Sequence, residues 1–251
     1  MVRKEYRNTR AAFQIHSFVA ETLPGMLGID AEFGEVVCNH VITQKLGLRA
    51  ETFETGIELD LMPGEAYEHD AGHVGRVAAL LMFRVFNDRP HDIYVPGAYA
   101  EIVKRSIGKL GLSRSVTSAE EGVAGTGEIL AAPHYYEEAA IARLTISNPG
   151  ADAGPAISDF ESTASQKGCC VRQVFLNIGD PAAGDVFRML FSKGYFFGGY
   201  LPRWFDSDGF LLQKLTRTPA VESMKLYSDW AKELLEFTLR DRTRASGQDN
   251  P

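Results

Sequence analysis

Two stretches of this chain, far apart in the sequence, carry the same succession of patterns. The first runs from Gly34 to Pro63 and the second from Val171 to Pro202. In each, an apolar run ends at an asparagine, a segment with helical spacing follows, and a second apolar run ends at a proline. Period-two alternation predicts strands, and i, i+4 spacing predicts a helix. The two stretches therefore predict two strand–helix–strand units and favour an internal duplication, although so common a succession can also occur twice by chance.

Residues typical of helix ends support the strand–helix–strand prediction for the second unit. Asp180 stands before Pro181, which is typical of a capping residue followed by proline in the first helical turn. Gly194 predicts the end of that helix, and Tyr195 to Leu201 predict the next strand. The adjacent Gly198 and Gly199 within this strand indicate a bulge or a close approach of another backbone.

Other segments complete a mixed succession of strands and helices. A continuous apolar run predicts a buried strand over Arg76–Phe86, and amphipathic spacing predicts a helix over Ala98–Leu110. Alternation predicts one strand from Tyr135 to Ile146, and a closing helix is predicted over 219–240. The fold class is therefore α/β or α+β, with a mixed β-sheet flanked by helices.

A small, polar, glycine-rich segment divides the chain of 251 residues. We predict an N-terminal unit over 1–112, a linker over 113–128 and a C-terminal unit over 129–251. The linker contains Gly122-x-x-Gly125-x-Gly127. Such a loop can cradle a phosphate when a helix follows it directly, but the pattern after it predicts a strand.

Composition narrows the classes of partner. The hydrophobic content is 45% and the net charge is −7, which indicates a globular protein without an expected nucleic-acid partner. No apolar run is long enough to span a membrane, and the first ten residues lack the apolar core of a signal peptide. The three cysteines, two of them adjacent, form no disulfide framework, so we expect a cytoplasmic location.

A polar loop over 64–74 holds His69, Asp70 and His73. A His-x-x-x-His pair binds metal when a helix places both rings on one face, but this pair brackets Ala71-Gly72 in a predicted loop. We expect a solvated loop and no metal.

The second unit resembles the C-terminal half of the GCN5-related N-acetyltransferase (GNAT) superfamily. In that family a strand ends at an asparagine, a helix follows, and a glycine–aromatic pair leads into the next strand. Here these elements are Val174 to Asn177, the helix from Pro181, and Gly194-Tyr195. The first unit, with Asn39 after its first strand, is similar but looser. The resemblance implies tandem, degenerate GNAT-like units.

The resemblance also implies a cofactor and its site. The cofactor would be acetyl-CoA or another acyl-CoA, with Asn177, Asn39 and Gly179 as cofactor-binding residues. The family binds the pyrophosphate of CoA with an [Arg/Gln]-x-x-Gly-x-[Gly/Ala] loop at a helix N-terminus after a splayed strand, and this chain lacks that motif. The family's frequent catalytic tyrosine would fall near Phe191, which has no proton to give.

Two functional hypotheses follow. The first is an acyl-CoA-dependent N-acyltransferase that acts on a small-molecule acyl acceptor, with Glu137 or Glu138 as the general base. The second is a catalytically inactive binding or accessory subunit of the same fold, which the missing motif and Phe191 favour. A homo-oligomer or a partner subunit that completes the site is compatible with both.

Overall fold

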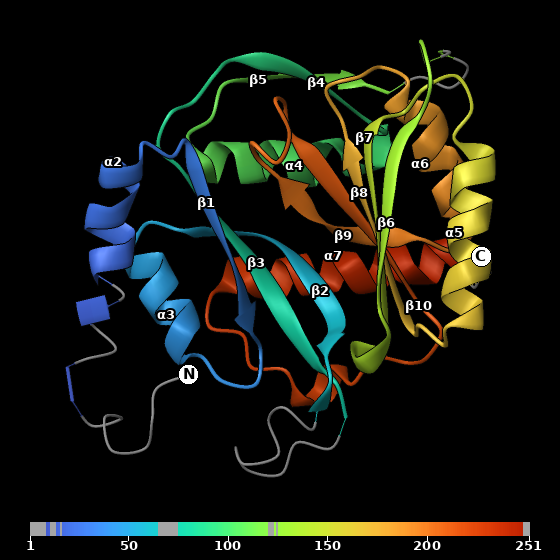
Figure 1. Cartoon of the computed structure of the whole chain (residues 1–251). Coiled ribbons are helices and arrows are strands. Elements are labelled where there is room, and N and C mark those ends of the chain that lie inside the picture. Colours follow the sequence, from blue (N-terminus) through green and yellow to red (C-terminus); the bar gives the residue numbers. More distant parts are fainter. Residues whose placement is uncertain are drawn as a thin grey trace.

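The computed structural model describes residues 9–10, 14–15, 17–64, 75–119, 123 and 125–247 (Figure 1). Most of the predicted loop over 64–74, with His69, Asp70 and His73, lies outside these residues. The strands are β1 (Ala31–Val37), β2 (Phe53–Met62), β3 (Val77–Val85), β4 (His91–Val95), β5 (Arg114–Ser118), β6 (Leu130–Tyr136), β7 (Ile141–Asn148), β8 (Val171–Asn177), β9 (Phe196–Leu201) and β10 (Gly209–Leu215). The helices are η2 (Phe18–Thr22), α2 (Leu23–Leu27), α3 (Ile42–Arg49), α4 (Gly97–Leu110), η4 (Glu137–Ala139), α5 (Gly154–Gln166), α6 (Ala183–Ser192), η5 (Val221–Ser223) and α7 (Asp229–Ala245).

Eight strands form one mixed sheet in the order β1-β3-β2-β9-β10-β8-β7-β6, and β4 pairs with β5 in a small parallel sheet. β7 and β8 are parallel, and the other neighbours are antiparallel. It follows that β1 and β2 run in the opposite direction to β7, β8 and β9. The fold is therefore mixed α/β, as the sequence predicts.

The two predicted units share one topology. In the first, β1, α3 and β2 are followed by β3, which inserts between β1 and β2 and is antiparallel to both. In the second, β8, α6 and β9 are followed by β10, which inserts between β8 and β9 in the same way. The units meet at the centre of the sheet, where Gly56 of β2 pairs with Gly199 of β9. A Cβ atom at Gly56 would lie 2.2 Å from the Gly198 carbonyl oxygen, so this contact accepts only glycine.

The main hydrophobic core lies on the outer face of the sheet. It joins side chains of α4, α5, α6 and α7 to those of the strands, including Ile57, Leu144 and Val174. Figure 1 shows α4 and α7 crossing behind the sheet, with α5 and α6 beside it. These helices therefore cover the same face, which is the expected burial of an apolar sheet face by amphipathic helices.

Three predicted elements differ from the structure. The strand predicted over Tyr135–Ile146 is a hairpin, because the turn η4 separates β6 from β7 and Ala140 takes a positive φ of 51°. The helix predicted over 219–240 begins only at Asp229, where Ser228 caps it by accepting a hydrogen bond from the Ala231 N–H. Part of the predicted linker forms β5. The predicted strand over Arg76–Phe86 is confirmed as β3.

Candidate functional site

The inner face of the sheet has three layers. Residues that face each other on neighbouring strands share a face, so the strand register assigns these side chains. An aromatic layer lies toward the carboxyl ends of β7 and β8, an aliphatic layer lies at the opposite end, and polar side chains lie between them. The polar layer consists of Glu35 on β1, Glu58 on β2, Arg143 on β7, Gln173 on β8 and Gln213 on β10.

The two ends of the sheet meet across this polar layer. Nη2 of Arg143 lies 2.9 Å from Oε1 of Glu35, although β7 and β1 are near opposite ends of the strand order. The Gln173 amide also crosses the interior, donating to Oε1 of Glu58 over 2.6 Å. The sheet is therefore curled on itself, as Figure 1 shows, and its inner face is buried like a second core.

Glu58 is the most unusual group of the polar layer, because its residue is 0% exposed. Oε1 accepts the Gln173 hydrogen bond and lies 3.6 Å from Nη2 of Arg143. Among the residues that the structure describes, Oε2 has no hydrogen-bond donor. Arg143 is held away from Oε2 because its Nε donates to Gln173 Oε1 and its Nη2 to Glu35. One buried carboxylate oxygen therefore remains free to accept a proton.

The environment raises the pKa of Glu58 to about 8. Burial is the main cause, since a low-polarity interior disfavours the ionised form, and the neighbouring Glu35 charge adds to it. Arg143 and the Gln173 hydrogen bond oppose the increase. A carboxyl group with a pKa near the working pH is suited to accept and return a proton.

An aromatic wall forms the next layer of the inner face. Trp204, in the loop after β9, stacks on Phe175 with ring centroids 5.2 Å apart and meets Phe33 edge-on at 4.8 Å. Phe33 also stacks on Phe83, yet 51% of its surface is exposed because β1 is an edge strand. Arg143 lies over the Phe175 ring at 5.5 Å. The polar layer is thus bounded by aromatic rings and reaches solvent beside Arg143 and Glu35, which are both partly exposed.

The predicted cofactor residue Asn177 is the last residue of β8, and its side chain holds the ends of β7 and β8 together. Its Nδ2 donates to the Ser147 carbonyl at 2.9 Å, and its Oδ1 accepts from the Gly179 N–H and the Ser207 hydroxyl. β7 and β8 stay paired as far as Ile146 and Leu176. The strands are therefore not splayed at the position where the resemblance implies an opening for acyl-CoA.

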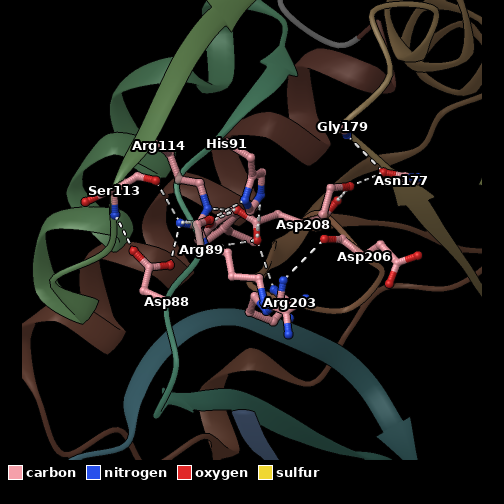
Figure 2. Close-up of polar contacts among 12 residues, drawn as sticks. Asp88, Arg89, His91, Ser113, Arg114, Asn177, Gly179, Arg203, Asp206 and Asp208 are labelled. Carbon is pink, nitrogen blue, oxygen red and sulfur yellow. Dashed lines mark hydrogen bonds and ion pairs between the residues drawn. The ribbon is translucent and has the colours of Figure 1, made fainter. Parts of the chain in front are cut away.

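Asn177 and Gly179 lie beside a buried ion-pair cluster (Figure 2). Asp208 accepts hydrogen bonds from Arg114 Nε at 2.6 Å and from the Arg203 N–H at 2.9 Å, and Tyr200 donates its hydroxyl proton to the same carboxylate. Oδ1 lies 3.3 Å from His91 Nε2. Burial opposes ionisation of Asp208, but the contact with His91 and the hydrogen bonds from Arg114 and Tyr200 outweigh it and lower its pKa.

This cluster joins the small sheet to the large one. Arg114 begins β5, has a fully buried side chain and also pairs with Asp88 over 2.6 Å. His91 begins β4, and its contact with Asp208 raises the pKa of the imidazole. Every oxygen of Asp208 is occupied by these partners, so we assign the cluster a structural role.

The predicted general bases lie far from the predicted cofactor residues. Glu137 and Glu138 sit in the exposed turn η4, where Lys167 Nζ contacts Glu137 Oε1. This turn adjoins the start of β7 and β8, whereas Asn177 and Gly179 lie at the other end of β8. The 7 residues of β8 separate the two ends by roughly 20 Å. Neither glutamate lies in a strand, because the turn η4 interrupts the strand predicted over Tyr135–Ile146.

Asn39 lies at the same end of the sheet as Glu137, since β1 runs opposite to β8. It is buried, and its Oδ1 has no hydrogen-bond partner in the described part of the chain. The five predicted site residues therefore do not form one site. Asn177 and Gly179 are brought together by a hydrogen bond, and the others are separate.

Sequence patterns missed Glu58 for a physical reason. The alternation of Ile57, Glu58 and Leu59 predicts a strand with one buried face and an exposed Glu58. The curled sheet buries both faces, so Glu58 lies inside. The sequence signal that bears on this closure is the adjacent Gly198 and Gly199, which indicate a close backbone approach without naming Gly56 as the partner.

Neither a metal site nor a membrane-spanning helix is found in the described part of the chain. No group of three or more histidine, cysteine, aspartate or glutamate side chains there is arranged to hold a metal ion. No helix within the same residues is long and apolar enough to cross a membrane. No protein-family model, no curated protein and no solved structure matches this chain.

We expect Asn177→Ala to lower the free energy of unfolding by about 0.5–1.5 kcal/mol, because it removes partly exposed hydrogen bonds that hold the ends of β7 and β8. The Ser147 carbonyl and the Gly179 N–H would both lose their partner. Urea denaturation measures the change. Asn87→Ala, which removes an exposed side-chain bond to Asp30, is the matched control and should change stability by less than about 0.5 kcal/mol. Equal effects of the two substitutions would refute the role of Asn177 at this edge.

Proposed function

We propose that this protein is an acyl-CoA-dependent N-acyltransferase in which Glu58 is the general base. The observation that carries the proposal is the free, buried Oε2 of Glu58 beside the partly exposed Arg143 and Glu35. An amine must lose a proton before or as it attacks an acyl group, and a positioned carboxylate can take that proton. The pKa of about 8 lets Glu58 be ionised in part of the molecules at neutral pH and still hold a proton well.

The acceptor in this proposal is a small-molecule amine that approaches between Glu35 and the aromatic wall. Glu35 and Arg143 neutralise each other over 2.9 Å, so the net negative charge that attracts an ammonium group is that of the ionised form of Glu58. Phe33 offers an exposed ring face beside these groups. Acyl-CoA would supply the activated acyl group, and the role of Glu58 would be to take one proton from the neutral amine as it attacks.

The order of strands and helices supports acyl-CoA as the donor, whereas the start of α5 argues against it. The succession β8, α6, β9 and β10, with Asn177 at the end of β8, is the part of the chain that resembles the GNAT superfamily. The start of α5, which follows β7, does not fit a diphosphate. Asp152 Oδ1 already accepts from the Gly154 N–H there, and Pro155 has no N–H to offer.

That detail favours a second candidate function, a catalytically inactive binding or accessory subunit of the same fold. An acidic side chain at the start of α5 repels a diphosphate, and the amide of Asn177 is already occupied. The two candidates differ in whether acyl-CoA binds and reacts.

The experiment begins with the melting temperature of the full chain in the presence of acetyl-CoA and longer acyl-CoAs. A donor that binds the native state raises the melting temperature with concentration, by the free energy RT ln(1 + [L]/Kd). Release of the CoA thiol with a panel of primary amines then reports turnover. No rise in melting temperature and no thiol release would reject the enzyme and support the accessory subunit.

Glu58→Gln tests the base itself. We expect turnover to fall by about 10²- to 10⁴-fold while the melting-temperature response to acetyl-CoA stays unchanged. Glu137→Gln and Glu138→Gln, in the exposed turn η4, are matched controls that should retain turnover. Loss of turnover in a control and not in Glu58→Gln would reverse the assignment.

A further inference from the structure

An apolar hollow lies on the outer face, away from Glu58. It has a volume of about 430 Å³, within the roughly 300–1,000 Å³ of small-molecule sites. The start of α4, the exposed side of α6 and the end of α7 surround it, with Tyr99, Phe187 and Phe191 as its aromatic lining and Ala98, Arg188 and Arg244 among its other residues. The sheet separates it from the polar layer, since Tyr99 and Phe187 belong to the outer core.

The polar groups of this hollow are arranged to favour an anion. Arg244 is partly exposed, and its guanidinium carbon lies 5.0 Å from the centre of the Phe191 ring and 5.7 Å from that of Tyr99. The hollow also includes Pro96 and Ala98 at the start of the 14-residue helix α4, where no side chain caps the backbone N–H groups. A free helix start carries a partial positive charge, which adds to that of Arg244.

The nearby acid, Asp241, is not among the residues that line the hollow, and both of its carboxylate oxygens accept hydrogen bonds. Its Oδ2 accepts from the Tyr99 hydroxyl at 2.9 Å and from the Phe197 N–H at 2.7 Å, and its Oδ1 holds Arg244 Nη2 at 2.6 Å. Asp241 therefore fixes the position of Arg244 and removes the one polar atom of Tyr99 from the lining. The remaining N–H groups of Arg244 can bind a carboxylate in the fork geometry that guanidinium groups favour.

We propose that this hollow is a binding site for a small apolar monocarboxylate, whose chain packs on Tyr99, Phe187 and Phe191 and whose carboxylate meets Arg244. The site is independent of the proposed acyl transfer, because it lies on the other face of the sheet and shares no residue with the Glu58 layer. A chain of about eight carbons suits the test, because each buried CH₂ contributes about 0.8 kcal/mol and a much shorter acid would bind weakly.

Isothermal titration of the full chain with octanoate tests the site, with octanol and octylammonium as probes of the same chain length. We expect octanoate to bind at least about tenfold more tightly than either, because only the carboxylate pairs with the guanidinium. Arg244→Gln should weaken octanoate binding about tenfold or more and leave octanol binding unchanged. Arg240→Gln, an exposed arginine one turn earlier on α7, is the matched control and should bind octanoate like the natural chain.

Ala98→Trp provides a second variant that leaves the core intact, because Ala98 is exposed and its new side chain can fill the hollow. Octanoate binding should be lost in this variant. Absence of octanoate binding to the natural chain, octanol binding as tight as octanoate, or retention of binding by Ala98→Trp would each overturn the proposal. None of these outcomes bears on acyl transfer, which is read from thiol release.

Discussion

Gly56→Ala is expected to lower the free energy of unfolding by about 3–5 kcal/mol, which is a large share of the 5–15 kcal/mol that holds a typical domain folded. The added Cβ would lie 2.2 Å from the Gly198 carbonyl oxygen and 2.3 Å from the Gly199 Cα. Both atoms belong to the backbone of β9, so no side chain can rotate away to make room. The two strands would have to separate at the only position where their register pairs them.

Urea denaturation of the natural chain, Gly56→Ala and Gly34→Ala measures this effect. Gly34 is the matched control because it also lies in a strand, its φ is ordinary, and the nearest atom to an added Cβ is a side-chain carbon of Val36 at 3.9 Å. We expect Gly34→Ala to change stability by less than about 1 kcal/mol. If both variants were equally stable, the contact between β2 and β9 would not join the two units as described.

Glu58→Gln should make the protein more stable than the natural chain at high pH. This gain in stability should become much smaller at low pH. The pKa of Glu58 is about 8 in the folded protein, above its ordinary value of 4.5. Between these values the folded state holds a proton that the unfolded state has released, so the contribution of Glu58 to stability falls as the pH rises through this window. Below about 4.5 both states are protonated and the cost disappears.

Glutamine has no charge to bury and can still accept the hydrogen bond that Gln173 donates. The stability difference between Glu58→Gln and the natural chain should therefore grow by on the order of 2–5 kcal/mol from pH 5 to pH 9. Urea denaturation at several pH values measures it, and the difference removes the effect of carboxylates common to both chains. Glu137→Gln, in an exposed turn, should follow the pH dependence of the natural chain. Parallel curves for Glu58→Gln and the natural chain would show that Glu58 is not held protonated by its surroundings.

These two predictions concern features that the sequence reveals to different degrees. The adjacent Gly198 and Gly199 indicate a close backbone approach, and the structure confirms it with Gly56 as the partner. The partner itself could not be predicted, because it lies more than 140 residues away and no local pattern encodes a distant contact. For Glu58 the sequence is misleading, since local alternation predicts an exposed side chain and the structure buries it.

The candidate site was the least predictable part of the molecule. The resemblance points to Asn177 from its place at the end of a strand, and the structure shows its amide holding β7, β8 and the loop with Ser207. The prediction of Glu137 and Glu138 depends on a strand that is interrupted by a turn. Arg143, Glu35 and Gln173 carry no sequence motif, and only the curl of the sheet brings them to Glu58.

The sequence alone determined the local elements: the strands β3, β8 and β9, the helices α3, α4 and α6, and the two repeated units. Hydrophobic periodicity and terminal residues act over a few positions, so they can be read without knowing the fold. The tertiary structure alone decided that the units join through two glycines and that the sheet curls until β1 meets β7. That closure removes water from the inner face, and the loss of solvation, not any local pattern, turns an ordinary strand glutamate into a proton-holding group.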